Sequence, residues 1–389
     1  MPLSSPSTAI VIGSGIVGAA TTYFLTQRGV KVTLLDAMVP AAGATGAADG
    51  AVSVASKRPG PMMTAALSGI ELYRELALGG LFSDLFKLRS TFIVAASEAE
   101  TEVLDAHATA LASAGVRVER LDRTTVRQRF SPLSENVRFA VEVHEEGHAI
   151  GYQIVHRLLA ASGVVVKRAN PVKAILRRSG QQAGGVLTAD GEIRADAVIV
   201  TAGSGSAALA GLQEVLIPRK GQLLVTERAR ALNAAMPGSI MSGRYLLSKG
   251  SQKGQAAPPR GLALVIDPLR TGQFLIGGTR EDHGDRHTND LDAVTRILRD
   301  AVALMPDLGN VRLLRSFAGV RTAVVDGLPL VGRISGYDNA YIATGFEGDG
   351  ICLGPIMGKA VANLVCGEAA GLNLAPFDPC RFVTREVAA

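Results

Sequence analysis

A turn near the start of the chain has a glycine spacing suited to phosphate binding. Gly13, Gly15 and Gly18 form a Gly-x-Gly-x-x-Gly pattern between an apolar run, residues 9–12, and a helical stretch that extends to about Arg28. In such a turn the first glycine permits a tight bend, the second lets a pyrophosphate approach the backbone, and the third lets the helix pack closely on the strand. The N–H groups and the positive dipole end of the helix would face the phosphates.

An acidic residue follows at the position where a ribose would lie. Residues 30–35 (VKVTLL) are typical of a second strand, which completes one β-α-β unit, and Asp36 comes directly after it. A carboxylate there accepts hydrogen bonds from ribose hydroxyls and disfavours a 2′-phosphate. The contacts to a dinucleotide predicted from this unit are Gly13, Gly15, Ile16, Val17, Gly18 and Asp36. The pattern alone does not choose between NAD and FAD.

A second glycine-rich turn lies near the other end of the chain. Residues 340–344 are typical of a strand, residues 345–350 read Gly-Phe-Glu-Gly-Asp-Gly, and residues 351–366 are typical of a helix. The N-terminus of that helix could stabilise negative charge on a reduced flavin ring. One dinucleotide extended between the first and last segments fits FAD better than NAD.

The elements around these turns predict two kinds of domain. Residues 197–200 form another apolar strand, whereas residues 88–95, 116–121 and 137–143 are predicted strands outside the first unit, with a helix over 98–114. A hairpin is expected at Asp190-Gly191. Between Leu216 and Arg315 the pattern predicts strands, turns and one helix, Asp290 to Met305, with a polar mobile loop over Ser248 to Gly261. The alternation indicates an α/β nucleotide-binding domain built from separate segments, with a strand-rich domain inserted twice.

Composition excludes several other functions. The 389 residues favour two or three domains. The small net charge of +5, with 4% aromatic residues and no tryptophan, argues against nucleic-acid binding. The 3 cysteines and 6 histidines show no spacing typical of metal ligands or of a disulfide framework. Residues 8–25 are nearly uncharged, but their glycine-rich pattern favours a buried strand, turn and helix over a membrane anchor. We therefore expect no metal site and a cytoplasmic protein.

The sequence resembles the D-amino-acid-oxidase/glycine-oxidase superfamily of FAD-dependent amine oxidoreductases. The matching segments extend from residue 9 to residue 366 and read IVIGSGIVGAATTYFLTQRGVKVTLLD, GATGAADG, ADAVIVTAG, FLIGGTRED, RSFAGVRTAVVDGLPLVG and YIATGFEGDGICLGPIMGK. The pair SKRPGP and GFEGDGI is closer to one branch, the FAD-carrying β subunits of heteromeric D-hydroxyproline, proline and opine dehydrogenases and sarcosine-oxidase-like enzymes.

The resemblance implies a fold and a division of the chain. The expected FAD-binding domain is Rossmann-like, of the glutathione-reductase type, and is assembled from residues 1–85, 145–216 and 318–389. Residues 86–144 and 217–317 would form an inserted α+β substrate domain with a mainly antiparallel sheet.

The resemblance also implies the remaining contacts to FAD. They would be made by the phosphate and ribityl neighbours Thr45, Gly46 and Ala47, by Lys57, by Val172 at the adenine, by Gly203 at the pyrophosphate, and by Gly348, Asp349, Gly350 and Ile351 at the flavin ring. The flavin is expected to be non-covalent, because Cys352 reads as a packed core thiol.

Two further residues are implied for the substrate. Arg321 matches the arginine that clamps a substrate carboxylate in related oxidases, a task suited to its planar fork, and a buried structural ion pair is the alternative. Tyr245 is a candidate second carboxylate contact or lid residue, and simple packing is its alternative. The chain departs from the family pattern at Phe346, where histidine is more usual, and at Thr322, where proline often follows the arginine.

The predicted activity is oxidation of the Cα–N bond of a D-amino acid or a secondary amine acid of the hydroxyproline, proline, opine or sarcosine type, by hydride transfer to flavin N5. The alternatives are an NAD-dependent dehydrogenase, a stand-alone soluble amino-acid or glycine oxidase, and a flavin-binding assembly subunit without catalysis. The likeness to β subunits implies partner subunits that carry an iron-sulfur centre or a second flavin, because the 3 cysteines form no cluster that could hold one.

Overall fold

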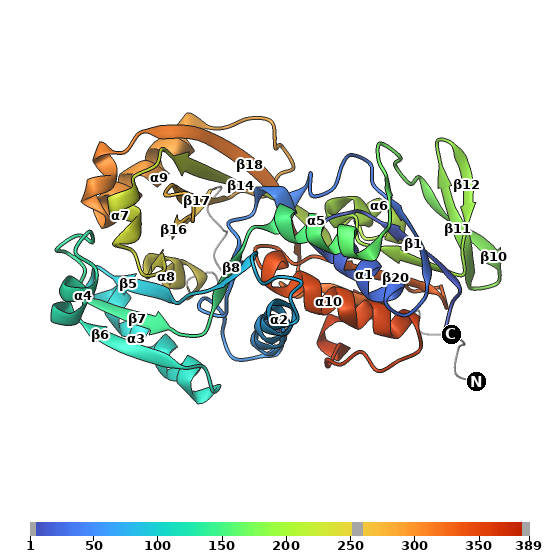
Figure 1. The fold of residues 1–389 in the computed structure, drawn as a ribbon, viewed down its shortest axis with the longest axis horizontal. Coiled ribbons are helices and arrows are strands. Elements are labelled where there is room, and N and C mark those ends of the chain that lie inside the picture. Colours follow the sequence, from blue (N-terminus) through green and yellow to red (C-terminus); the bar gives the residue numbers. More distant parts are fainter. Residues whose placement is uncertain (1–4, 251–259, 383–389) are drawn as a thin grey trace, which may run out of the picture.

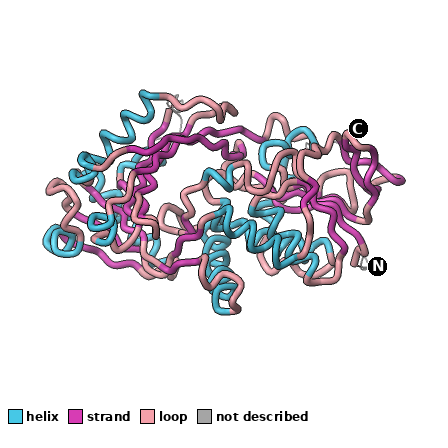
Figure 2. Tube along the Cα trace, turned by 45° about the horizontal axis from the view of Figure 1, so that its top comes forward, coloured by secondary structure: helices cyan, strands magenta, loops and turns pink. Residues whose placement is uncertain are grey.

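Two large sheets occupy opposite ends of the molecule in the computed structural model (Figures 1 and 2). The structure describes residues 5–250 and 260–382. Within these ranges the strands form a six-stranded sheet, an eight-stranded sheet and two sheets of three strands.

The six-stranded sheet contains the apolar runs predicted to form the nucleotide-binding unit. Its order is β19-β20-β13-β1-β2-β9, with bounds Leu330–Arg333, Ala340–Thr344, Ala197–Val200, Thr8–Ile12, Lys31–Leu35 and Val166–Lys167. All neighbours are parallel except β19 and β20. Strand β1 lies inside the sheet and is buried on both faces, which explains why its sequence is continuously apolar.

Different elements cover the two faces of this sheet. Ala9 and Val11 pack in the same core as the helices α1 (Ile16–Thr26), α5 (Gly151–Ser162) and α10 (Gly350–Val365). Ile10 and Ile12 pack instead with the three-stranded sheet β10-β11-β12, which spans Ala174–Ser179, Gln182–Thr188 and Gly191–Arg194. The predicted hairpin at Asp190-Gly191 is the turn between β11 and β12.

Helices α1 and α10 approach each other closely through glycine. A Cβ atom at Gly354 would lie 2.7 Å from Ile16 Cγ2, and one at Gly358 would lie 2.7 Å from Ala20 Cβ. Because real Cβ contacts are longer than this, larger residues at these two positions would separate the helices. The first and last segments of the nucleotide-binding domain are therefore held together side by side.

The eight-stranded sheet is mainly antiparallel, with the order β18-β14-β17-β16-β15-β5-β7-β6. The bounds in that order are Leu313–Val324, Leu216–Thr226, Phe274–Arg280, Gly261–Pro268, Ser239–Ser242, Thr91–Ala95, Phe139–Val143 and Val118–Asp122. Only the pairing of β15 with β5 is parallel. Apolar residues of this sheet form a core with apolar residues of the helices α4 (Arg123–Arg129) and α9 (Leu291–Leu304). The helices α3 (Glu98–Ser113), α7 (Arg230–Ala234) and α8 (Arg244–Gly250) lie beside it.

A small sheet, β3-β8-β4, lies between the two large sheets. It spans Ala51–Val52, Gly147–Ala149 and Phe86–Leu88. Helix α2 (Pro61–Leu78) follows β3 in the chain and begins with proline at its first position, where the missing N–H has no helical partner to lose.

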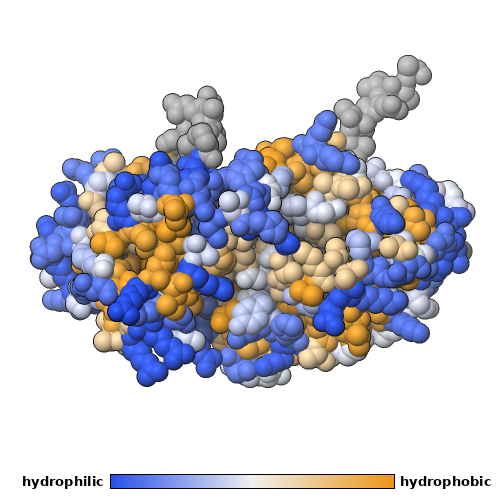
Figure 3. Space-filling model, turned by 90° about the horizontal axis from the view of Figure 1, so that it is seen from above, coloured by the Kyte–Doolittle hydropathy of each residue, from blue (hydrophilic) through white to orange (hydrophobic). Residues whose placement is uncertain are grey.

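The outer surface is predominantly hydrophilic at both ends of the face drawn in Figure 3, with smaller apolar areas between. None of the helices in the described ranges is long and apolar enough to cross a membrane.

The predicted fold class is confirmed, with three local corrections. The single strand expected over Leu88 to Ala95 is two strands of different sheets, because Leu88 of β4 pairs with β8 whereas Thr91 of β5 pairs with β7 and β15. Arg89, between them, forms a buried ion pair with Asp267. The region from Leu216 to Arg315 holds the short helices α7 and α8 besides α9. The loop expected over Ser248 to Gly261 is replaced at its edges by α8 and β16, and residues 251–259 lie outside the described part. The domain division stays a prediction, and strands β14 and β18 cross its limits at 216/217 and 317/318.

Candidate active site

Three adjoining cavities run from the six-stranded sheet to the eight-stranded sheet. The first cavity lies along the carboxyl ends of β1 and β2, and its lining includes Gly13, Gly15, Asp36, Val172 and Gly203. The middle cavity shares five lining residues with the first, which are Ile16, Ala44, Thr45, Glu347 and Gly350. The distal cavity shares four with the middle one, which are Asp49, Leu223, Arg321 and Gly348. The shared residues make the three cavities one continuous site.

Two helices begin at the wall of this site. Helix α1 begins at Ile16 and α10 begins at Gly350, and both residues line the first and middle cavities. The Ile16 N–H donates a hydrogen bond to Thr45 Oγ1 at 3.1 Å. Helix N-termini carry partial positive charge, so this arrangement favours an anionic group between α1 and α10.

The glycines of the first turn divide into two roles. A Cβ atom at Gly18 would lie 1.9 Å from the Gly13 carbonyl oxygen, so Gly18 is required for packing and does not line the cavities. A Cβ atom at Gly15 would meet only Thr45 Oγ1, at 3.3 Å, and one at Gly348 would meet nothing within 4 Å. The space beside Gly15 and Gly348 is therefore open toward the site, as a cradle for a pyrophosphate and a flat ring requires.

Asp36 is held rigidly at the wall of the first cavity. Its Oδ2 accepts hydrogen bonds from the Ser14 N–H at 2.7 Å and from Ser14 Oγ at 2.6 Å. Its Oδ1 accepts one from the Met38 N–H at 2.7 Å. Each carboxylate oxygen has a further lone pair, so the geometry leaves room for the predicted bond from a ribose hydroxyl.

The other predicted cofactor contacts lie mostly along this run of cavities. The first cavity is lined by Val17, Val172 and Gly203, and it shares Thr45 and Gly350 with the middle cavity. The middle cavity is also lined by Ala47 and Ile351, and it shares Gly348 with the distal cavity. The distal cavity is lined by Asp349. Gly46 does not line them, because a Cβ atom there would point at the Ala41 carbonyl oxygen, 2.3 Å away. Lys57 lines only the distal cavity, where its Nζ donates to Asp349 Oδ1 at 2.6 Å.

The two predicted substrate residues meet in the distal cavity. Arg321, on β18, lies over Gly221 of β14, where a Cβ atom would be 2.6 Å from Arg321 Nη2. Its Nη1 donates to the Thr279 carbonyl oxygen at 3.0 Å. Tyr245, on α8, accepts a hydrogen bond from Arg280 Nη1 at 3.1 Å. Both side chains line the cavity with Arg280.

Arg321 is not part of an ion pair within the described residues, since no carboxylate oxygen there lies within 4.0 Å of its guanidinium. Burial lowers the pKa of the Arg321 guanidinium, and the charge of Arg280 lowers it further. A half-buried cation without a carboxylate partner is costly, which favours an anionic ligand at this position.

The second glycine-rich turn is fixed by ion pairs from other elements. Glu347 has a positive φ of 48° and accepts from Arg219 Nη1 at 2.9 Å, and it also pairs with Arg280. Its neighbour Asp349 pairs with Lys57. These contacts join the turn to β14, β17 and the segment before α2, so they set its position in the site. The sequence reasoning missed Glu347 and Arg280, although Glu347 lies inside the predicted turn.

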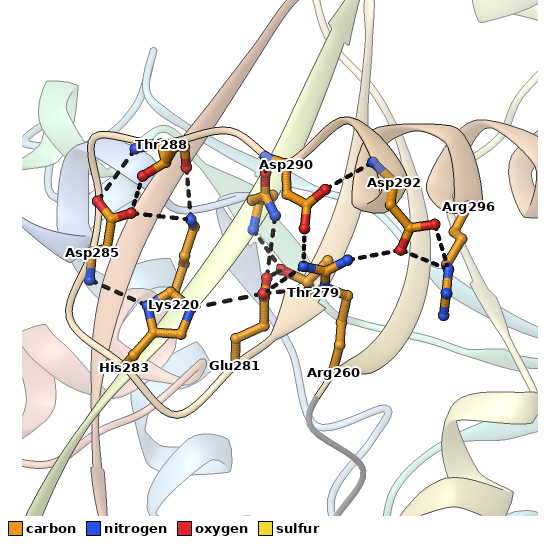
Figure 4. Close-up of polar contacts among 11 residues, drawn as sticks. Lys220, Arg260, Thr279, Glu281, His283, Asp285, Thr288, Asp290, Asp292 and Arg296 are labelled. Carbon is orange, nitrogen blue, oxygen red and sulfur yellow. Dashed lines mark hydrogen bonds and ion pairs between the residues drawn. The ribbon is translucent and has the colours of Figure 1, made fainter.

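A polar network around the buried Glu281, the residue after β17, connects β14 with β17 (Figure 4). The Glu281 carboxylate accepts hydrogen bonds from Thr279 Oγ1 at 2.7 Å, Gln222 Nε2 at 3.1 Å and Arg260 Nε at 3.1 Å. Burial raises the pKa of the Glu281 carboxyl, but these hydrogen bonds outweigh it and hold the pKa below its ordinary value. Because the Thr279 carbonyl is the acceptor for Arg321, the network also fixes the guanidinium.

His148 gives the protein a pH-dependent stability. Burial lowers the pKa of His148 from 6.5 to about 4, and its Nε2 lies 2.9 Å from the Asp49 carbonyl oxygen. The folded state therefore disfavours protonation, so the stabilisation is full above pH 6.5 and is lost as the pH falls toward 4. We expect denaturant unfolding at pH 4.5 to show about 2–3 kcal/mol more loss, relative to pH 7.5, in the wild type than in a His148→Gln variant. An equal loss in both proteins would contradict this assignment.

Two possible alternative sites have local explanations. The Cys352 thiol is buried, donates to the Ala66 carbonyl oxygen at 3.6 Å, and has its pKa raised to about 12 by burial, as expected of a packed thiol. Among the described residues, Glu119, Glu142 and His144 place ligand atoms within 4.8 Å of one another. However, the Arg129 guanidinium already pairs with Glu142 at 2.7 Å and with Glu119 at 3.6 Å.

Comparison with known proteins matches the whole site region. The model of the DAO family, described as FAD dependent oxidoreductase, matches residues 8–364. Glycine oxidase of Pseudomonas aeruginosa is 25% identical over 95% of this chain and 98% of its own length. The hydrogen cyanide synthase subunit HcnC of Pseudomonas protegens is 26% identical over 97% of each chain. The crystal structure of glycine oxidase from Bacillus cereus superposes with a TM-score of 0.82 at 25% identity and covers 93% of this chain and 95% of its own.

These findings confirm FAD as the cofactor, and the alternative of an NAD-dependent dehydrogenase is wrong. The long cavity, the open space beside Gly15 and Gly348 and the two helix N-termini fit an extended dinucleotide. The first cavity, with Asp36 and Val172 in its lining, suits the adenosine half, and the middle cavity suits the flavin ring.

Proposed function

Because the chain belongs to the DAO family of FAD-dependent oxidoreductases, we propose that it oxidises the Cα–N bond of a D-amino acid or a secondary amine acid of the hydroxyproline, proline, opine or sarcosine type. We further propose that it does so as the catalytic subunit of a heteromeric dehydrogenase. The observation that carries the first proposal is Arg321, a cation without a carboxylate partner among the described residues, in a cavity that opens onto the predicted flavin position.

The residues of the distal cavity would bind and orient such a substrate. Arg321 presents a planar fork that can grip a carboxylate with two hydrogen bonds, and Tyr245 lines the same cavity. When bound, FAD supplies the hydride acceptor. Orientation of the substrate Cα–H bond toward the middle cavity then accounts for much of the catalysis, because a near-attack geometry lowers the entropic part of the barrier.

The names of three similar proteins support an amine substrate and a subunit role. The relatives from Pseudomonas aeruginosa and Bacillus cereus are glycine oxidases, which act on an amino acid. The relative from Pseudomonas protegens is a subunit of hydrogen cyanide synthase. With only 3 cysteines in the chain, any iron-sulfur relay would reside on a partner. A cytoplasmic location is part of the same proposal.

Two observations weigh against loss of catalysis. Phe346 lines the first cavity and is absent from the lining of the distal cavity, so it leaves the substrate position open. Thr322 bonds Ser204 Oγ at 3.0 Å, and its carbonyl accepts from the Glu347 N–H at 2.8 Å, so it supports the second turn. Neither departure from the family pattern removes a group from the distal cavity.

A reduction assay tests the proposal. The purified chain would receive a panel of amine acids, and hydrogen peroxide formation and reduction of an artificial dye would be followed together. We expect at least one amine acid to reduce the dye, with peroxide formed much more slowly. Peroxide formation as fast as dye reduction, in a chain that co-purifies with no partner, would favour the stand-alone oxidase. No reduction by any amine acid would contradict the amine-oxidising function.

A further inference from the structure

We propose that Asp49 binds the amino group of the substrate, opposite Arg321, and accepts a proton from its ammonium form. The site would therefore select zwitterions, which carry a carboxylate and a cationic amine on one carbon, over acids without an amine. This assignment rests on the proposed function, because it adds a second contact to the same substrate.

The charges around the distal cavity lead to Asp49. Three cations, Lys57, Arg280 and Arg321, and three carboxylates line this cavity, and the carboxylates are Asp49, Asp267 and Asp349. Lys57 pairs with Asp349 at 2.6 Å. Arg280 pairs with Glu347, and Asp267 pairs with Arg89 and accepts from Ser239 Oγ. Within the described part of the chain, Arg321 and Asp49 are the two lining charges without an ion-pair partner.

The backbone aims Asp49 into the cavity and holds it there. Its carbonyl oxygen lies 2.9 Å from His148 Nε2, and its Oδ1 accepts from the Ala51 N–H at 3.1 Å. The next residue, Gly50, has a φ of +92°, and a Cβ atom there would lie 2.7 Å from the Ala149 carbonyl oxygen, so the turn requires glycine. Oδ2 has no hydrogen-bond donor among the residues that the structure describes.

The two unpaired charges lie where the middle and distal cavities meet. Asp49 and Arg321 are two of the four residues that line both cavities. The carboxylate and the amine of an α-amino acid are attached to the same carbon, so two contacts from these residues would fix the Cα position and the direction of its C–H bond. Such two-point orientation beside the predicted flavin position is what the proposed reaction needs.

The proton step is chemically balanced. The substrate N–H bond breaks, an O–H bond forms on Asp49, and the electron pair stays on nitrogen, which leaves the neutral amine that the reaction uses. Burial raises the pKa of the Asp49 carboxyl, and the charge of Asp267 raises it further. The Ala51 N–H, Arg321 and His148 act in the opposite direction without cancelling the rise. A raised pKa makes this carboxylate a stronger proton acceptor.

An Asp49→Asn holoenzyme separates this role from a structural one. Ligand binding would be followed by the change in flavin absorbance, with propionate as an acid without an amine and with the best amine acid of the panel under anaerobic conditions. We expect the dissociation constant of propionate to stay within about threefold of wild type, and that of the amine acid to rise at least tenfold. In the variant, the pH dependence of flavin reduction should follow the amine's own ionisation.

Two further variants make the outcome decisive. Asp105→Asn removes the same charge from an exposed position on α3, paired with Arg120, and should leave both ligands unaffected. Asp49→Glu keeps a carboxylate and should recover part of the amine-acid affinity. This variant therefore tests the assignment even if the asparagine variant does not fold. Equal retention or equal loss of both ligands in Asp49→Asn would overturn the assignment. A wild-type flavin that no amine acid reduces would instead overturn the proposed function, and the assignment with it.

Discussion

An Arg321→Lys enzyme is expected to hold its flavin normally and to lose at least a hundredfold in kcat/KM toward its amine acid. Lysine keeps the positive charge but cannot form two parallel hydrogen bonds with a carboxylate. Arg321 is enclosed by the distal cavity and held by the Thr279 carbonyl, so a shorter side chain would not restore the contact. Truncating one partner of a buried, hydrogen-bonded charge pair costs about 2–5 kcal/mol, and about 3 kcal/mol corresponds to the hundredfold loss.

Steady-state kinetics and the flavin spectrum together check this expectation. Arg120→Lys, on the exposed side of β6, is the matched control and should behave as wild type. Unchanged kinetics in Arg321→Lys would show that the arginine has only a structural role. If Arg321→Lys loses both its activity and its flavin, the guanidinium of Arg321 is needed for the fold and not for substrate binding.

A Gly15→Ala protein is expected to fold and to bind FAD at least a hundredfold more weakly. Gly15 has a φ of −70°, which alanine adopts without strain, and its Cβ would meet only Thr45 Oγ1, at 3.3 Å. The new methyl group would occupy the space that a pyrophosphate needs beside the N-terminus of α1. Loss of about two charge-assisted hydrogen bonds, at about 1.5–3 kcal/mol each, accounts for the size of the effect.

The test is the flavin content after purification and the FAD dissociation constant of the apoprotein, with circular dichroism as the check on folding. Gly309→Ala is the control, because a Cβ atom there would make only an ordinary contact, 3.6 Å from Val302 Cγ1, and Gly309 lines none of the three cavities. A yellow Gly15→Ala protein with wild-type affinity would mean that the pyrophosphate does not approach this turn.

Local patterns were sufficient to predict the nucleotide-binding half. The apolar run of β1, the glycine spacing after it and the position of Asp36 are short-range signals, because strand, turn and helix follow one another within one unit. The second turn before α10 is encoded in the same way. The structure placed both turns along one site, as the two separate motifs had indicated.

The distal cavity could not be predicted to the same degree, because distant strands build it. Arg280 faces the site only once β17 is paired with β14 and β16. Asp49 differs from the other carboxylates of the cavity only in having no ion-pair partner among the described residues, which the sequence does not show. Lys57 was predicted at the cofactor, but its partner Asp349 is far away in the sequence. The ion pair of Arg89, between β4 and β5, with Asp267 likewise joins residues far apart in the sequence. Pairings at such separations leave no periodic signal in either segment.

The arrangement of the central strands has a consequence for synthesis on the ribosome. Strand β1 pairs with β2 and with β13, β13 pairs with β20, and α10 follows β20, so neighbours in the sheet are made at very different times. At about 5–20 residues per second, β1 and β2 wait many seconds for β13 and longer for β20. The emerging chain therefore exposes an unpaired apolar strand edge, a recognised target for chaperones and for aggregation. Flavin capture must be a late event, because α10 completes the site only after almost the whole domain has left the ribosome.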